Sequence, residues 1–346
     1  MNLPPRSLRS PPPGRLVSRA ICALVAFMLC GAAAGEATEV RIGRQLGVGY
    51  LQVYVMQEQK LLEKYAKEEG IDGLDVAYQP IGSPALLNDG LLAGKLDIVV
   101  AGPTSFLVLW DRTRNSANPV RMIAGLSEQP VYLIANTPRI KSLKDFTDSD
   151  RIAVPAIKTS TQAILLGIAA EKLYGPEQRS HFDKMEISFS HPDAVTALLS
   201  GSVITAHFAS IPFYDQELAH GGTHKVTSSY DILGGPATLF CLWGTSQFRT
   251  ENPKIIRALW KALSDATDFI KQHPAEAAEI YIKLDHSKFS VDAIAKILTD
   301  PQVVYSLTPT NIMPIADYMA KLGMLHNKPG SWKELVFPEA YALPGS

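Results

Sequence analysis

The segment from Arg151 to Gly167 reads RIAVPAIKTSTQAILLG. The run Ile152 to Val154 predicts a strand, and the apolar periodicity after Thr161 predicts a helix. A hydroxyl-rich turn, Lys158-Thr159-Ser160-Thr161, lies between them. The first N–H groups of a helix lack internal partners and carry partial positive charge, so the turn either caps its own helix or binds an anion. The segment therefore predicts α/β architecture and a candidate anion site.

The same strand-to-helix design recurs in three other places. These junctions are Gly82-Ser83-Pro84, Gly102-Pro103-Thr104-Ser105 and Phe208-Ala209-Ser210-Ile211-Pro212. In open α/β sheets, the carboxyl ends of strands and the amino ends of helices share the edge where ligands bind. Each junction alone is also what an ordinary helix cap looks like. Together the four predict that helix starts converge on one cleft.

Short strand-like runs alternate with helical patterns along most of the chain, which predicts an α/β fold with mostly parallel sheets. Strands are expected over 40–43, 74–78, 96–101, 122–124, 131–135, 185–189, 203–208 and 238–244. Beyond them an apolar stripe from Ile255 to Ile270 predicts carboxy-terminal helices. A mature chain of just over 300 residues exceeds one comfortable core and predicts two lobes.

The first 37 residues have the pattern of a secretory signal peptide. Four arginines precede the apolar run Ala20 to Cys30, and small residues allow cleavage after Ala34 or Ala37. The run is shorter than the roughly 20 apolar residues that span a membrane, and the bulky Leu29 disfavours a lipid anchor on Cys30. We therefore expect a mature protein in the periplasm.

Charge and cysteine content narrow the partners. Beyond residue 34 the chain has 29 basic and 34 acidic residues, a net charge of −5, and no clustered basic excess that would indicate nucleic-acid binding. Cys22 and Cys30 lie in the predicted signal peptide, which leaves Cys241 alone in an apolar run. No intramolecular disulfide is then possible, and Cys241 is expected to be a small buried residue.

No catalytic or metal-binding pattern stands out. The chain has no Gly-x-Ser-x-Gly elbow and no glycine-rich phosphate loop. His220 and His224 flank Gly221-Gly222, which predicts solvated loop residues and not a helical metal face. His207, at the end of a predicted strand, is either a core-edge histidine or a donor at the cleft. We expect no catalytic residue, no cofactor and no metal.

Several segments resemble a known family, the solute-binding proteins of ABC importers for nitrate, sulfonates, taurine and thiamine precursors. They are Val40-Arg41-Ile42-Gly43, Gly82-Ser83-Pro84, Leu91 to Ile98, Ile140 to Phe146 before Arg151, and Pro329 to Lys333 followed by Phe337-Pro338-Glu339. The resemblance covers essentially the whole mature chain, although each motif is degenerate.

The resemblance implies a two-lobed periplasmic-binding-protein fold of type II with two hinge crossings, near Val131 to Asn136 and Leu233 to Leu239. Lobe 1 would comprise residues 38–135 and 236–346, and lobe 2 residues 136–235. The implied protein is a monomer that passes its solute to an ABC permease in the inner membrane.

The family pattern places the cleft on the loop Gln45 to Tyr50, on Ser83, on Thr104 and Ser105, and on Lys158 to Thr161. The end of the strand predicted over 203–208 adds two more residues. The candidate ligand-binding residues are then Gln45, Tyr50, Ser83, Thr104, Ser105, Lys158, Thr159, Ser160, Thr161, His207 and Phe208. Where many relatives carry an acidic or tryptophan-containing stretch, this chain has Ala206-His207-Phe208-Ala209. The missing acid disfavours an amine-bearing solute such as taurine.

These observations predict an extracytoplasmic binding protein, not an enzyme, that captures a small organic anion such as a sulfonate or carboxylate. One alternative is a thiamine-pyrimidine-related binding protein or enzyme of the same fold, which the lone Cys241 and the signal peptide disfavour. Another is a periplasmic sensor partner that uses the same closure to engage a membrane receptor.

Overall fold

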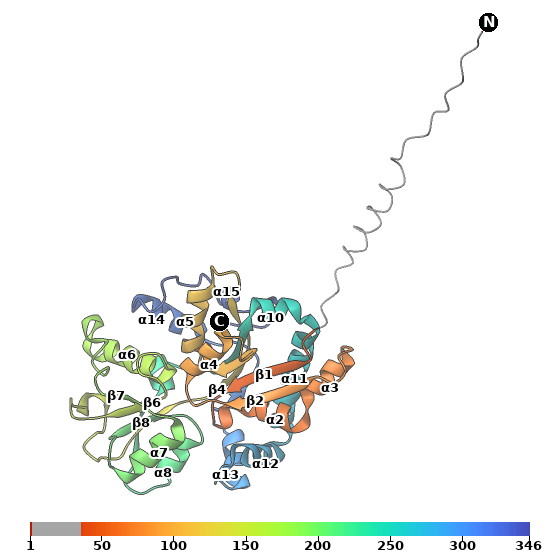
Figure 1. Cartoon of the computed structure of the whole chain (residues 1–346). Coiled ribbons are helices and arrows are strands. Elements are labelled where there is room, and N and C mark those ends of the chain that lie inside the picture. The colour runs from red at the N-terminus through yellow and green to blue at the C-terminus, as the bar shows by residue number, and fades with distance from the viewer. Residues whose placement is uncertain (2–35) are drawn as a thin grey trace. The chain divides into compact units, whose positions relative to one another are not determined.

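Two β-sheets organise the chain in the computed structural model, which describes Met1 and residues 36–346 (Figure 1). In the first sheet the order is β11-β4-β10-β3-β1-β2, with β1 (Glu39–Arg44), β2 (Asp75–Pro80), β3 (Ile98–Ala101), β4 (Val120–Glu128), β10 (Thr238–Thr245) and β11 (Val304–Tyr305). In the second the order is β7-β6-β8-β5-β9, with β5 (Tyr132–Ala135), β6 (Ile152–Val154), β7 (Glu186–Ser188), β8 (Ala206–Ala209) and β9 (His224–Ser228). The α/β fold class is confirmed. The predicted signal peptide, with Cys22 and Cys30, lies outside the described residues except for Met1, Glu36 and Ala37.

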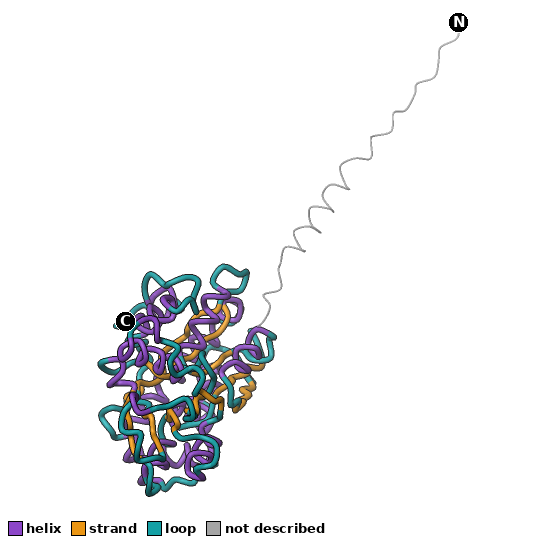
Figure 2. Tube along the Cα trace, turned by 90° about the vertical axis from the view of Figure 1, so that its left-hand side faces the viewer, coloured by secondary structure: helices purple, strands orange, loops and turns teal. Residues whose placement is uncertain are grey.

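Helices follow most strands of both sheets, and Figure 2 draws the helices in purple and the strands in orange. Those that follow strands of the first sheet are α2 (Leu51–Gln59), α3 (Leu61–Glu68), α4 (Pro84–Leu92), α5 (Pro103–Thr113) and α10 (Ser246–Glu251). The second sheet has α6 (Thr161–Tyr174), α7 (His191–Ser200), α8 (Phe213–Leu218) and α9 (Ser229–Leu233). The carboxy-terminal part adds α11 (Pro253–Gln272), α12 (Pro274–Asp285), α13 (Val291–Leu298), α14 (Ile312–Lys321) and α15 (Trp332–Leu335). Four 3-10 turns complete the described part: η1 (Val48–Tyr50), η2 (Leu143–Asp145), η3 (Pro176–Gln178) and η4 (Pro338–Ala340).

Both sheets are mixed, which corrects the expectation of mostly parallel strands. The pairs β1–β2, β1–β3, β6–β7 and β6–β8 are parallel. In contrast, β10 is antiparallel to β3 and β4, β11 to β4, and β5 to β8 and β9. The antiparallel strands include β4, β5, β9 and β10, which lie on either side of the two passages between the sheets. Parallel neighbours in one sheet need a crossover connection that brings the chain back to the same end of the sheet. A strand that enters a sheet from the other end runs antiparallel to its neighbours.

The chain passes between the sheets twice within one compact unit, Glu36–Ser346. The first passage, over residues 129–131, joins β4 to β5, and the second, over 234–237, joins α9 to β10. Both passages fall near the predicted crossings. The lobe boundaries themselves stay a prediction.

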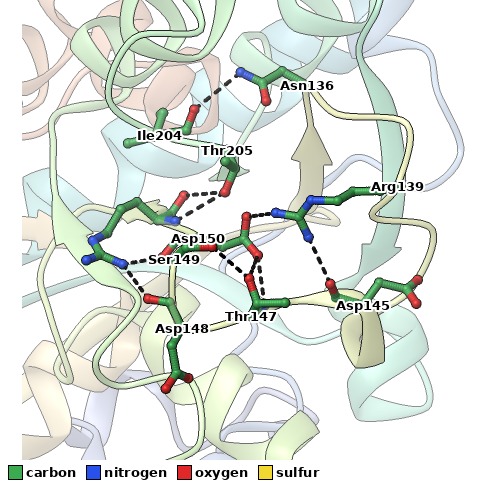
Figure 3. Close-up of polar contacts among 10 residues, drawn as sticks. Asn136, Arg139, Asp145, Thr147, Asp148, Ser149, Asp150, Ile204 and Thr205 are labelled. Atoms are coloured by element: carbon green, nitrogen blue, oxygen red, sulfur yellow. Dashed lines mark hydrogen bonds and ion pairs between the residues drawn. The ribbon is translucent and has the colours of Figure 1, made fainter.

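A buried carboxylate fixes the chain before β6 (Figure 3). Asp150, which is fully buried, accepts hydrogen bonds from the N–H and hydroxyl of Thr147 at 2.7 and 2.9 Å and pairs with the Arg139 guanidinium. The next residue, Arg151, binds Thr205 through its N–H at 3.1 Å. The network ties the segment after β5 to the residue that precedes β8, so it orients the strand that leads to the hydroxyl-rich turn.

The core confirms several sequence expectations. Cys241 is fully buried, as is most of the predicted apolar stripe on α11, including Ile255, Leu259 and Leu263. His224 is a correction, because it lies on β9, where its Nε2 is 2.6 Å from the carbonyl of Ile140, while His220 is exposed as expected. Within residues 36–346, no helix combines the length and apolarity that crossing a membrane requires.

Candidate functional site

Four helices begin at one small cavity between the two sheets, which we call the cleft cavity. They are α4, α5, α6 and α7. Its lining residues are Gln45, Pro84, Gly102, Thr104, Ser105, Pro155, Ser160, Thr161, Gln162, His191, Leu239 and Phe240. The cavity measures about 20 Å³, room for roughly one water molecule. None of these described lining residues carries an ionised carboxylate, ammonium or guanidinium group.

Ser160 caps α6 from inside the cleft cavity. Its Oγ accepts a hydrogen bond from the N–H of Ala163 at 3.3 Å, and the residue is only 3% exposed. The capping interpretation of the turn is therefore correct. The anion interpretation survives beside it, because the N–H groups of Thr161 and Gln162 begin the helix and have no partner within it. Both residues line the cavity.

The start of α5 faces the start of α6 across the cavity. The Thr104 hydroxyl donates to the carbonyl of Thr159 at 2.8 Å and lies 3.4 Å from the Thr161 hydroxyl. A Cβ on Gly102 would lie 2.6 Å from Thr161 Oγ1, so only glycine permits this approach. These contacts join an element of the first sheet to one of the second, so the protein is in a closed arrangement.

Phe240 and Gln45 form another wall of the cavity, and Tyr50 supports both of them. Tyr50 packs on Phe240 with ring centroids 4.3 Å apart, and its hydroxyl donates to Gln45 Oε1 at 3.2 Å. The Gln45 amide nitrogen in turn donates to the carbonyl of Gly82 at 3.0 Å. Burial raises the pKa of Tyr50 well above its ordinary value, so the phenol is neutral. Tyr50 thus lies behind the cavity and holds Gln45, and does not itself line it.

His191, the first residue of α7, reaches the cavity at the end of a buried polar chain. Its Nδ1 is 2.9 Å from Nε2 of His207, whose Nδ1 is 2.5 Å from Oε1 of Glu217. His207 and Glu217 are almost completely buried. Burial raises the pKa of Glu217 to about 9 and lowers that of His207 to about 3. A protonated carboxyl group beside neutral imidazoles is therefore the favoured state near pH 7.

The structure brings together only part of the predicted site. Gln45, Thr104, Ser105, Ser160 and Thr161 line the cavity. His207 reaches it only through His191.

The other predicted residues lie away from the cavity. Lys158 has a positive φ of 61°, and its side chain, 63% exposed, pairs with Asp183 at 3.4 Å. Thr159 is exposed and only its carbonyl faces Thr104. Ser83 is half-buried next to Pro84, which does line the cavity. Phe208 is fully buried in the core, because successive strand residues point to opposite faces and His207 takes the other one.

Seven lining residues are not among the predicted ligand-binding residues, although Pro84 and Gly102 belong to two of the recognised junctions. They are Pro84, Gly102, Pro155, Gln162, His191, Leu239 and Phe240. One signal was available, because Ser190-His191-Pro192 follows a strand and combines a serine with an early proline, as Gly82-Ser83-Pro84 does. The junction ending at Pro212 instead leads to the short helix α8, away from the cleft cavity. No group of three or more His, Cys, Asp or Glu side chains with metal-binding geometry occurs in the described residues.

The fold and the inter-sheet cavity define an α/β protein of the periplasmic-binding-protein class. The sequence model of the NMT1-like family matches residues 33–284, so the chain belongs to that family. This agrees with the resemblance to nitrate and sulfonate binding proteins noted above. No curated protein matches the sequence.

Solved structures share the fold at low sequence identity. The alkanesulfonate-binding protein SsuA from Xanthomonas axonopodis pv. citri, bound to MOPS, is 16% identical with a TM-score of 0.65, over 85% of this chain and 96% of that one. The periplasmic aliphatic sulphonate binding protein SsuA from Escherichia coli is 17% identical with a TM-score of 0.64, over 89% and 99%. The periplasmic nitrate-binding protein NrtA from Synechocystis PCC 6803 is 13% identical with a TM-score of 0.65, over 86% and 84%. Each of these three matched proteins is named as a binding protein.

Proposed function

We propose that this protein is an extracytoplasmic solute-binding protein that closes on a small organic anion in the cleft cavity and delivers it to an ABC importer. The observation that carries the proposal is the convergence of the amino ends of α4, α5, α6 and α7 on one cavity. Each helix start presents unpaired N–H groups and partial positive charge, so their sum favours an anion. A sulfonate or carboxylate is the class of solute that fits.

The lining supports an anion over a cation. A cationic solute would find no carboxylate among the described lining residues, and an unpaired buried charge is costly. The Thr161 hydroxyl adds a hydrogen-bond donor, whereas the hydroxyls of Thr104 and Ser105 already donate to the carbonyls of Thr159 and Gly102. Leu239 and Phe240 offer apolar contact for the uncharged end. The names of the sulfonate and nitrate binding proteins above point to the same class of ligand.

The closed cavity requires movement before a solute can enter. Its volume of about 20 Å³ is smaller than any organic anion. The surfaces that carry Thr104 and Thr159 must therefore separate to admit a solute, and when they close again the lining side chains must shift to enlarge the cavity around it. Such closure is a population shift driven by the solute's preference for the closed form.

We further propose that the chain is exported to the periplasm, cleaved after Ala34 and active as a monomer. Cleavage there retains Glu36, whose carboxylate accepts hydrogen bonds from the N–H groups of Lys254 and Ile255 at the start of α11, at 2.9 to 3.0 Å. The N–H of Ala37 donates to Asn252 Oδ1 at 2.7 Å. Cleavage after Ala37 would remove both contacts.

Calorimetry with a panel of solutes tests the binding function. The panel comprises nitrate, ethanesulfonate and benzoate as anions, ethylammonium as a cation, and an aminopyrimidine as the alternative uncharged class. We expect saturable binding of at least one anion and none of ethylammonium. Folded protein that binds no anion, or that prefers the aminopyrimidine, would contradict the proposal.

A further inference from the structure

The outer nitrogen of His191 is the free end of a buried three-residue chain. Nδ1 of His191 is taken up by His207, and the His191 ring stacks on Phe213 with centroids 5.3 Å apart. Nε2 has no hydrogen-bond partner among the described residues, while the side chain lines the cleft cavity. Whether this nitrogen presents an N–H or a lone pair to the cavity depends on the protonation of His207 and Glu217.

The number of protons shared by Glu217, His207 and His191 decides whether Nε2 of His191 is a hydrogen-bond donor or an acceptor. One proton is needed in the contact between Glu217 and His207, and one between His207 and His191. With a third proton the chain is neutral and His191 Nε2 carries hydrogen, wherever the first proton lies. With only two protons the chain has a net charge of −1, and Nε2 turns a lone pair toward the cavity. Loss of one proton therefore converts a donor into an acceptor.

The surroundings favour the neutral chain. The residues paired with His207 on the flanking strands β5 and β6 are Ile134 and Ala153, which are apolar. Glu217 Oε2 has no partner in the described part of the protein, which a carboxylic acid tolerates better than a carboxylate does.

Other titratable groups on these elements face elsewhere. On α7, Asp193 hydrogen bonds Ser190. On α8, Asp215 opens to a separate hollow shared with Lys296 and Asp300. Burial is the cause of the pKa shifts of both Glu217 and His207, and no charged side chain among the described residues contributes to them.

We propose that His191 contacts the anionic solute through its Nε2–H, and that His207 and Glu217 are positioning residues that keep this nitrogen a donor. The solute is then held only while the chain keeps its third proton. The contact with the solute rests on the proposed function, whereas the protonation of His191 can be tested without any solute.

Histidine-selective ¹⁵N NMR of the folded protein tests the polarity without any solute. Near pH 7 we expect His191 to be neutral, with hydrogen on Nε2 and not on Nδ1, since Nδ1 accepts from His207. The Glu217→Gln variant should give the same form, because its amide nitrogen donates to His207 as the carboxylic acid does. Hydrogen on Nδ1 of His191 in the wild-type protein would overturn the proposed polarity.

Binding of ethanesulfonate and of nitrate, measured by calorimetry, tests the contact. His191→Phe keeps the ring that stacks on Phe213 but removes the donor, and we expect binding to weaken roughly tenfold or more. His191→Gln restores a donor and should recover part of the loss. Unfolding midpoints of both variants identify any loss of folding. Equal affinity of stably folded His191→Phe and wild-type protein would overturn the contact.

The pH profile separates a positioning role from a merely structural one. From about pH 7 to about pH 10, across the pKa of about 9 that burial gives Glu217, wild-type affinity should fall as the third proton leaves. The Glu217→Gln variant should bind as the wild type does at pH 7 and show no such fall. A large loss at pH 7 in this variant would mean that the carboxylate form is needed, against the proposal. If neither anion binds the wild type, the solute contact falls with the proposed function, and the NMR result still decides the polarity.

Discussion

Among single residues, Asp150 shows how one carboxylate fixes the local structure from which the site is built. Its burial disfavours the charged form, but the hydrogen bonds from Thr147 and Arg139 outweigh burial and hold its pKa below the ordinary value. Asp150→Asn keeps the shape and removes the charge. We expect a loss of about 2 kcal/mol in the free energy of unfolding at pH 7, the scale of charged hydrogen bonds. Urea unfolding measures it.

Acid pH provides a second measurement of the same interaction. Because the folded pKa lies below the unfolded one, the unfolded chain binds the proton first, and the contribution of Asp150 is lost as pH falls through the folded pKa. The difference between wild type and Asp150→Asn should therefore shrink from pH 7 to about pH 3. Asp148→Asn is the control. Among the described residues that exposed carboxylate pairs with Lys184 alone, and the substitution leaves the hydrogen bond from the Arg151 guanidinium to the Asp148 carbonyl in place. A difference that stays constant with pH would refute the role of the charge.

At the scale of elements, two serines cap helices with the same geometry but in different places. Ser160 Oγ accepts from Ala163 N–H at the start of α6, and Ser290 Oγ accepts from Ala293 N–H at 3.2 Å at the start of α13. Only Ser160 lines the cleft cavity. Ser160→Ala and Ser290→Ala should each cost about 1 kcal/mol of stability.

The two caps should differ in solute binding. Ser160→Ala should also weaken binding of whichever anion of the panel the wild type takes, while Ser290→Ala should leave it unchanged. Thermal unfolding measures the stability of both variants, and calorimetry measures their affinity for the anion. Equal affinities in the two variants would mean that the α6 start has no part in the site.

Element junctions also mark how far the sequence predicts this site. Caps and prolines next to strand-like runs locate the starts of α4, α5 and α6, because such signals are local. The role of His191 depends on α7 packing against β8, which brings it to His207 sixteen positions later in the chain. No short-range pattern contains that contact. The direction of β10 likewise follows from the return of the chain to the first sheet, which periodicity does not record.

For the whole molecule, the hydrogen bond from Thr104 to the carbonyl of Thr159 joins the two sheets' helices directly at the cavity. The open form competes with the closed, solute-bound form. A contact made only on closure stabilises the closed form and therefore raises the affinity for the solute. Thr104→Val keeps the shape of the side chain and removes the donor. The closed form should then lose about 1 kcal/mol relative to the open form, a shift of roughly fivefold.

Two measurements follow this shift in the same variant. Small-angle X-ray scattering should show a larger mean radius of gyration for solute-free Thr104→Val than for wild type, and calorimetry should show an affinity for the bound anion that is lower by up to the same factor. Thr267→Val is the matched control, because its buried hydroxyl donates to Leu263 within α11 and makes no contact at the cavity. That control should lose stability without a change in radius or affinity. If Thr104→Val matches wild type in both measurements, closure does not depend on this bond, and the energy that holds the two sheets' helices together must come from the apolar contacts beside it.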